Sequence, residues 1–268
     1  MEITRLNGAL AARVTGIDWN AGLHDGDLKE IADALAEHGV LAVAAAGMRP
    51  EQHVQLAAHF GELEHHEFFE NQGPGREHIT VLDSARGDKS SMWHIDEQFL
   101  ERPPIVTMTH ALQVPAFGGD TSFISLHAAY DGLSPNMQDY LDGLYAVHDL
   151  ARIAEMVWQG GHGGPEQLAE SLLKGKQASH PVVLVHPVTG RQALYVSPTY
   201  TRFIQGISMG ESRAILGFLY EHVQRPEFAY RHRWEVGDLL VWDNRSVMHH
   251  AAFDYTDRRI MHRISVIG

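Results

Sequence analysis

The sequence predicts a mainly β protein, a β-sandwich or jelly roll, with flanking helices. Short segments rich in β-branched and aromatic residues recur along the chain, whereas helical periodicity is confined to three segments. Gly-Asp and Asn-Arg pairs separate the strand-like segments, as expected of turns. No repeat, low-complexity stretch or Pro/Ser-rich linker divides the sequence, so we expect a single domain over residues 1–268.

The three helical segments have apolar residues three or four positions apart and recognisable ends. Gly39 follows the first and is suited to a helix C-cap. Pro50 lies in the first turn of the second, and Gly61 follows its end. Pro226 lies beyond the third. We therefore expect helices over residues 27–38, 50–60 and 211–223.

The strand-like segments are short, and their residue types favour pleated, buried structure. Residues 40–45 form an apolar run typical of a buried strand. The other expected strands cover residues 105–112, 182–186, 193–196, 239–242 and 260–267. Strands of this kind, with few helices outside them, favour a jelly roll with helical cover.

Composition restricts the classes of function. Hydrophobic residues make up 44% and charged residues 21%, which is typical of a globular protein with a full core. No apolar run is long enough for a membrane span, and the first residues do not resemble a secretion signal. The net charge of −13 argues against a nucleic-acid partner, although buried arginines could still bind a small anion.

Cysteine is absent, so a metal would have to be bound by His, Asp or Glu. These ligands suit iron, manganese or zinc rather than an iron–sulfur cluster. The lack of cysteine is also compatible with a cytoplasmic location, which we expect for this chain.

His94 and Asp96 are a candidate pair of metal ligands. If residues 93–98 are extended, both side chains project from the same face. Two histidines and one carboxylate form the facial triad of non-heme iron oxygenases, with the third ligand supplied by a distant strand. However, a chain with 19 histidines is expected to contain about one His-x-Asp by chance, and a loop hydrogen bond would explain the pair equally well.

Four separated motifs change this balance. They are Trp93-His94-Ile95-Asp96, Gly118-Gly119-Asp120-Thr121, Trp242-Asp243-Asn244-Arg245 followed by His249, and the arginine-rich segment 258–263. In this order, from about residue 60 to the end of the chain, they resemble the taurine dioxygenase (TauD/TfdA) family of Fe(II)- and 2-oxoglutarate-dependent dioxygenases. The resemblance implies the double-stranded β-helix form of the jelly roll, with Fe(II), 2-oxoglutarate and O₂ as cofactors.

The resemblance also implies the metal ligands His94, Asp96 and His249. Adjacent strand residues face opposite ways, so only one of His249 and His250 can face the metal. The residues alone leave this choice open, and the family spacing from Trp242 selects His249. A second His-x-carboxylate pair, His65 with Glu67, has no comparable support.

Two arginines, Arg259 and Arg263, lie four residues apart and share one face of an extended strand. On a solvated edge they would need no partner, but inside the protein each would need an anion. A guanidinium binds a carboxylate or sulfonate through two parallel hydrogen bonds. By resemblance, Arg259 and Thr121 bind the far carboxylate of 2-oxoglutarate, and Arg263 binds the acidic group of the substrate.

The remaining pocket residues implied by the resemblance are His66, Phe69, Ser90 and Tyr200. Phe69 replaces a tyrosine of the taurine enzyme, and Ser90 lies near the position of its asparagine. Both changes remove or shorten polar groups. Taurine itself is therefore not the expected substrate, and an acidic substrate with a more apolar body fits better.

We accordingly expect a dioxygenase that hydroxylates, next to a heteroatom, a sulfonate, an alkyl sulfate, or an aryloxy- or amino-type carboxylate. Desaturation or another oxidation by the same iron centre is one alternative. A zinc hydrolase on a jelly-roll scaffold is another, and a non-catalytic jelly-roll binding protein a third. A small organic anion is the expected partner, without nucleic acid or membrane, and a homo-oligomer is left open.

Overall fold

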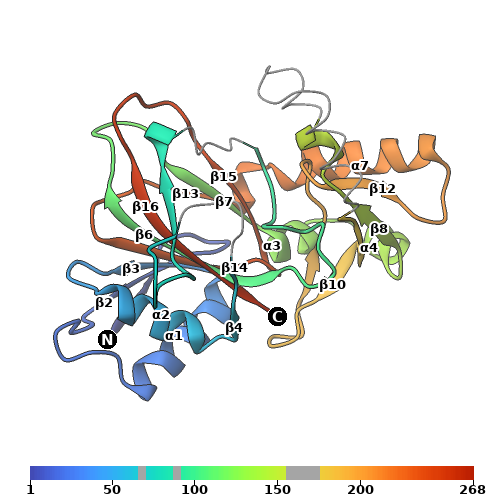
Figure 1. Ribbon diagram of the computed structural model, residues 1–268. Helices are drawn as coiled ribbons and strands as arrows, with labels where there is room; N and C mark the ends of the chain where they lie inside the picture. Colours follow the sequence, from blue (N-terminus) through green and yellow to red (C-terminus); the bar gives the residue numbers. More distant parts are fainter. Residues whose placement is uncertain (66–70, 87–91, 155–175) are drawn as a thin grey trace.

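The computed structural model describes residues 1–65, 71–86, 92–154 and 176–268. Its largest element is an eight-stranded sheet in the order β1-β2-β3-β14-β6-β16-β4, with β5 paired to β16 (Figure 1). The strands of this large sheet are β1 (Glu2–Arg5), β2 (Ala12–Thr15), β3 (Val40–Ala44), β4 (Glu62–Leu63), β5 (Thr80–Asp83), β6 (Pro104–Gln113), β14 (Asp238–Asp243) and β16 (Ile260–Ile267).

A three-stranded sheet in the order β13-β7-β15 packs against part of the large sheet. Its strands are β7 (Thr121–Ser125), β13 (Ala229–His232) and β15 (Val247–Ala251). One buried cluster combines Phe123 and Val247 of this sheet with Leu240, Trp242 and Met261 of the large sheet. The two sheets therefore enclose a common core, which is the jelly-roll architecture expected from the sequence.

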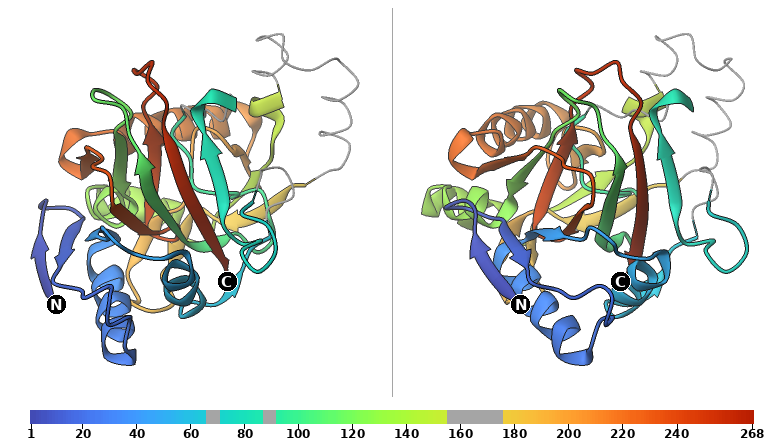
Figure 2. Two further views of the ribbon diagram at one scale, coloured as in Figure 1. Left: turned by 60° about the vertical axis from the view of Figure 1, so that its left-hand side comes forward. Right: turned by 90° about the vertical axis from the view of Figure 1, so that its left-hand side faces the viewer.

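Helices cover the outer face of the large sheet and one end of the molecule. Helices α1 (Asp25–His38) and α2 (Pro50–Ala58) lie on the side of the large sheet that faces away from the three-stranded sheet (Figures 1 and 2). Further helices are α3 (Leu126–Asp131), α4 (Pro135–Leu141) and α7 (Met209–Val223), with the short 3-10 turns η1 (Ser84–Arg86) and η2 (Pro226–Phe228). Within the described ranges, no helix is long and apolar enough to cross a membrane.

Two small sheets pack with α3, α4 and α7 around a second core. They are the sheet β12-β8-β9 and the hairpin β10-β11, formed by β8 (Tyr145–His148), β9 (Ala178–Pro181), β10 (Val183–Val185), β11 (Gln192–Leu194) and β12 (Thr201–Ile204). Their buried side chains join those of α7, including Leu216 and Leu219.

Alternation along β6 explains how the large sheet separates two environments. Val106 and Met108 belong to the cluster that packs under α1 and α2. Thr107 and Thr109 alternate with them and project to the other face, toward the three-stranded sheet. The polar side of β6 is therefore buried inside the jelly roll, where a polar site can be built.

The predicted elements are confirmed in type, with small differences in length. Helix α1 starts two residues earlier than expected, α7 also starts two residues earlier, and β16 has the expected bounds. The assumption that residues 93–98 are extended is wrong, because His94 forms a single β-bridge and a turn begins at Asp96. Most strands that the sequence did not predict have four residues or fewer, so their periodicity is too short to detect.

Several buried histidines are neutral parts of the core. His53, His148 and His262 are at most 9% exposed. Burial lowers the pKa of His53 and His148 to about 3 and that of His262 to about 4, and neighbouring histidines add to the effect. Each therefore stays uncharged in the folded protein at pH values where an unfolded histidine binds a proton.

This difference predicts acid lability. The pKa of each histidine in the folded protein lies below the unfolded value of 6.5. Its contribution to the free energy of unfolding is therefore fully present above pH 6.5 and is lost as the pH falls below that value. Each such histidine can lower the free energy of unfolding by up to about 1.4 kcal/mol per pH unit. The free energy of unfolding should be measured by urea denaturation at pH 7.5, 6.5 and 5.5. It should decrease less steeply with falling pH in His53→Gln than in the exposed control His59→Gln. Equal slopes in both variants would contradict the prediction.

Candidate metal centre

A backbone bridge joins two distant histidines. His94 N donates to His249 O (3.0 Å), and His249 N donates to His94 O (2.9 Å). His249 lies in β15, and the bridge brings the two imidazole centroids to 4.2 Å from each other. Asp96 follows His94 in a turn, which directs its carboxylate to the same place.

His94, Asp96 and His249 form a compact ligand set. Asp96 Oδ1 lies 3.5 Å from His94 Nε2 and 3.7 Å from His249 Nε2. One ligand atom from each residue lies within 4.8 Å of the others. His94 Nδ1 lies 2.7 Å from Met92 O, so its proton can be held there and Nε2 is left available to a metal. This donor set fits Fe(II), with three positions left for other ligands.

The protonation states also suit metal binding. Burial opposes ionisation of Asp96, but Arg263 and the two histidines outweigh it and hold the pKa of Asp96 well below its usual range. Burial, with His94 nearby, lowers the pKa of His249 to about 3. A carboxylate and neutral imidazoles are the forms that bind a metal.

The alternative histidines do not join this set. His250 pairs with Ser122 of β7, and its ring lies 5.4 Å from that of Trp93. The ring of His65 lies 6.5 Å from that of His78. Glu67 lies outside the described residues. The ligand set among the described residues therefore contains His249, as the motif spacing implied.

Arg259 lies one residue before β16, beside an aromatic residue that also contacts Thr121. Its Cζ is 5.5 Å from the centroid of Trp234, and Trp234 Nε1 donates to Thr121 Oγ1 (2.9 Å). Burial lowers the pKa of Arg259, although Tyr255 opposes this effect. Arg259 Nε is buried without a hydrogen-bond partner among the described residues. Arg259 and Thr121 thus both contact Trp234, and Arg259 keeps one buried donor without a partner among the described residues.

Arg263 lies within β16 and contacts the ligand set directly. Its Nη2 is 2.9 Å from Asp96 Oδ1, and its side chain is 18% exposed. Although burial opposes its charge, the carboxylates of Asp96, Glu97 and Glu64 raise the pKa of Arg263. Arg263 Nε is also buried without a hydrogen-bond partner in the part of the chain that the structure describes. Arg263 is thus paired with a metal-ligand candidate and keeps one donor for another group.

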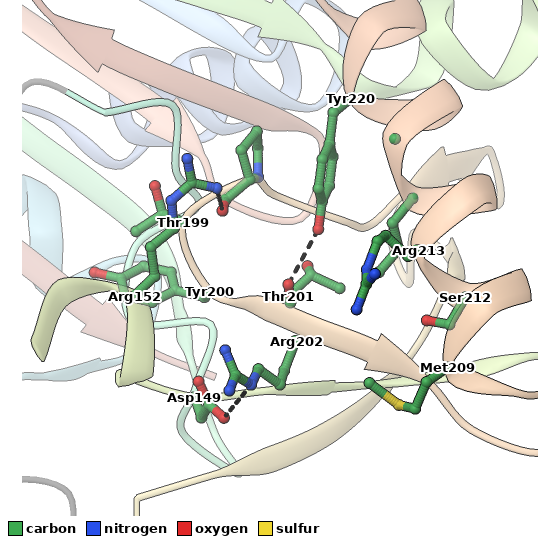
Figure 3. A pocket seen from close by; sticks show the side chains of 13 residues that line it. Asp149, Arg152, Thr199, Tyr200, Thr201, Arg202, Met209, Ser212, Arg213 and Tyr220 are labelled. Carbon is green, nitrogen blue, oxygen red and sulfur yellow. Dashed lines mark hydrogen bonds and ion pairs between the residues drawn. The ribbon is translucent and has the colours of Figure 1, made fainter. Parts of the chain in front are cut away.

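Tyr200 lies between the metal centre and a surface pocket. Its ring is 6.3 Å from that of His94 and 5.1 Å from that of Phe99. The pocket has a volume of about 640 Å³, and Figure 3 shows Arg152, Arg202 and Arg213 around it. His66, Phe69 and Ser90, the other expected pocket residues, lie outside the described residues.

Sequence reasoning missed two carboxyl groups beside Arg263. Glu97 has a φ of 43°, an unusual conformation for a residue with a side chain. Its carboxyl group hydrogen-bonds to that of Glu64, and burial together with this contact raises the pKa of Glu97 to about 8. No motif contains both residues, so only their proximity in space could have identified them.

Comparisons with known proteins agree with this geometry. A family model described as "Taurine catabolism dioxygenase TauD, TfdA family" matches residues 2–265. An alkylsulfatase from Acinetobacter baylyi is 31% identical over 290 residues, which cover 100% of this chain and 85% of the relative. An alpha-ketoglutarate-dependent 2,4-dichlorophenoxyacetate dioxygenase from Cupriavidus pinatubonensis is 30% identical, covering 98% of this chain and 96% of the relative.

The fold is shared as well. The crystal structure of a taurine dioxygenase from Burkholderia xenovorans has a TM-score of 0.83 and 30% sequence identity, covering 100% of this chain and 89% of the other. The metal-ligand set, the buried Nε of Arg259 without a partner among the described residues, and these similarities give one conclusion. The chain belongs to the TauD/TfdA family of Fe(II)- and 2-oxoglutarate-dependent dioxygenases.

Proposed function

We propose that this enzyme oxidises a small organic anion. One arginine would bind 2-oxoglutarate, and a second arginine would bind the substrate. Fe(II) would be held by His94, Asp96 and His249. The far carboxylate of 2-oxoglutarate would be bound by Arg259 and Thr121, and the substrate anion by the donors of Arg263. The observation that carries this proposal is the pair of buried Nε donors without partners among the described residues. A buried, unsatisfied cationic donor is costly unless a ligand supplies an acceptor.

Fe(II) and 2-oxoglutarate, when bound, supply the oxidation: O₂ is consumed, 2-oxoglutarate becomes succinate and CO₂, and a substrate C–H bond is oxidised. The task of the chain is positioning. The rings of Phe123 and Trp242 lie 5.9 and 4.9 Å from that of His249 and fix its orientation. Their packing also excludes water from this side of the ligand set.

The substrate class is inferred from the site and from the relatives. The named relatives include an alkylsulfatase and a 2,4-dichlorophenoxyacetate dioxygenase, whose names indicate an organic sulfate and an aryloxy carboxylate. A sulfonate, alkyl sulfate or carboxylate would suit the donors of Arg263. We propose hydroxylation next to a heteroatom, with His66, Phe69, Ser90 and Tyr200 around the substrate. Desaturation by the same iron centre is the second outcome to test.

Anaerobic titration with Fe(II) and 2-oxoglutarate tests the co-substrate site, because the chelated complex gives a weak visible absorption band. Oxygen consumption should then be measured with matched pairs of substrates: alkyl sulfates and aryloxyacetates against their neutral alcohol and amide analogues. Faster turnover of the anionic members is the expected result. Hydrolysis without 2-oxoglutarate, or equal rates for both members, would contradict the proposal.

Replacing Arg263 by glutamine tests the role of the substrate arginine. Loss of one partner of a buried charge pair costs about 2–5 kcal/mol, so kcat/KM for an anionic substrate should fall at least about 30-fold. Because Arg263 also pairs with Asp96, the visible band of the Fe(II)–2-oxoglutarate complex must be measured first in this variant. A normal band with slow, uncoupled succinate formation is expected. Equal turnover of a neutral substrate by wild type and variant would instead identify Arg263 as a structural partner of Asp96.

We also propose that residues 1–268 act as a single domain, since the family model spans nearly all of them. A cytoplasmic location and the absence of nucleic-acid partners remain expectations from the cysteine-free, acidic composition. Size-exclusion chromatography with light scattering would test for a homo-oligomer.

A further inference from the structure

The second oxygen of Asp96 is held by a chain of buried hydrogen bonds. Thr107 Oγ1 donates to Asp96 Oδ2 (2.8 Å), and Asn244 Nδ2 donates to Thr107 Oγ1 (2.8 Å). Trp242 Nε1 in turn donates to Asn244 Oδ1 (3.0 Å). All four residues are at most 4% exposed. No solvent competes with these bonds, so they restrict the rotamers of every member.

The direction of this chain is fixed by its chemistry. An indole nitrogen can only donate, so the oxygen of the Asn244 amide must face Trp242 and its nitrogen must face Thr107. The Thr107 hydroxyl accepts from Asn244 and has a single hydrogen, which it gives to Asp96. All three donors therefore point along the chain toward the carboxylate, and the bond from Thr107 to Asp96 is the last of them. Such an arrangement strengthens this last contact.

Strand register and one turn assemble the chain. Trp242 of β14 pairs directly with Thr107 of β6. After β14 the backbone turns, and Asn244 N donates to Ile105 O (2.9 Å), which returns the Asn244 side chain to Thr107. Asp243 is fixed in the same turn by two hydrogen bonds from the side chain of Arg245, of 2.9 and 2.6 Å. The turn that carries Asn244 is therefore rigidly attached to the large sheet.

We propose that Thr107 and Asn244 are positioning residues that make Asp96 bind the metal through Oδ1 alone. Oδ1 is the oxygen that lies 3.5 and 3.7 Å from the two histidines, and Arg263 Nη2 lies 2.9 Å from the same oxygen. Oδ2 instead accepts the hydrogen bond from Thr107. A carboxylate with two free oxygens can bind a metal through both. That would use a position that 2-oxoglutarate needs. The inference rests on the proposed ligand roles of His94, Asp96 and His249.

Co(II) binding without 2-oxoglutarate or substrate provides a readout separate from activity. Thr107→Val removes the hydroxyl at nearly constant volume. It should weaken Co(II) affinity about 10–100-fold by calorimetry and change the visible Co(II) spectrum. Thr107→Ser keeps the donor and should restore affinity to within about threefold. The matched control Thr109→Val removes a hydroxyl from the same face of β6 and should leave both affinity and spectrum unchanged.

A second variant keeps the test decisive if Thr107→Val does not fold. Asn244→Ala leaves the Thr107 hydroxyl but not its orientation, so a smaller loss, about 3–10-fold, is expected. If both variants fold, the double variant should be no worse than Thr107→Val, because both act through one hydrogen bond.

The outcomes separate this inference from the proposed function. Wild type that binds no Co(II) would overturn the ligand set itself. Wild-type binding together with unchanged Co(II) affinity and spectrum in Thr107→Val would overturn only the positioning role. The Asn244→Ala result decides in the same way if Thr107→Val does not fold. A lower melting temperature of the metal-free variants with unchanged Co(II) affinity would show that the hydrogen-bond chain acts on the fold alone.

Discussion

Replacing His249 by alanine is expected to lower substrate-dependent succinate formation by more than about 100-fold. Loss of a residue that only supports a metal ligand costs up to about 100-fold, and loss of the ligand itself should cost more. The physical reason is that His249 Nε2 lies at the ligand set, 3.7 Å from Asp96 Oδ1, with its ring held by Phe123 and Trp242. His94→Ala and Asp96→Ala should have effects of the same size. Succinate release should be measured with saturating Fe(II) and 2-oxoglutarate, together with Co(II) affinity.

The neighbouring His250→Ala is the matched control. It removes the same side chain one residue further along β15, on the opposite face of the strand, where His250 contacts Trp93. Most of the activity and the full Co(II) affinity should remain in this variant. The opposite pattern, with loss in His250→Ala and none in His249→Ala, would mean that the third ligand has been assigned wrongly.

Replacing Arg259 by alanine is expected to weaken 2-oxoglutarate binding about 30- to 5000-fold, which corresponds to the roughly 2–5 kcal/mol lost when one partner of a buried charge pair is removed. Arg259 supplies a buried Nε donor that has no partner among the described residues, and Trp234 holds its guanidinium near Thr121. The Kd should be obtained by anaerobic titration of the visible band. Arg259→Lys should recover only part of the affinity, because an ammonium cannot form two parallel hydrogen bonds.

Arg258→Ala controls for the loss of one positive charge next to this site. Arg258 binds Asp83 through two hydrogen bonds, and its side chain is 53% exposed, so it points away from the buried donor. The affinity for 2-oxoglutarate should change less than about threefold in this variant, because the charge that is removed is largely screened by solvent. Equal losses in Arg258→Ala and Arg259→Ala would indicate a general electrostatic effect and would rule out a specific anchor at Arg259.

Much of the site could be predicted from sequence because its chemistry depends on residue types at fixed spacing. The His94-x-Asp96 pair was ambiguous alone, and the later motifs with His249 and Arg259 made it specific. Helix ends were also local features: α1 ends before Gly39, whose φ is 70°, and α2 begins at Pro50. Local conformational preferences suffice for such positions, because they do not depend on the rest of the chain.

Other features required the folded chain. The residues alone left His249 and His250 equivalent, and the β-bridge to His94 distinguished them because it fixes which face of β15 meets Asp96. Arg263 looked like a free anion anchor, yet it lies 2.9 Å from Asp96 Oδ1, a contact between residues 167 positions apart. Pairings over such separations follow from strand register, which no single segment encodes.

The sequence by itself therefore determined the class of fold and the candidate side chains for binding iron and 2-oxoglutarate. Only the tertiary structure decided how each is held. Thr107 belongs to none of the sequence motifs. It is positioned by the register of β6 and β14, which pairs it with Trp242 and brings it within hydrogen-bond distance of Asn244. The physical reason is that hydrogen bonds with lengths near 2.8 Å depend on distances between strands, and these are fixed by the packing of the whole sheet.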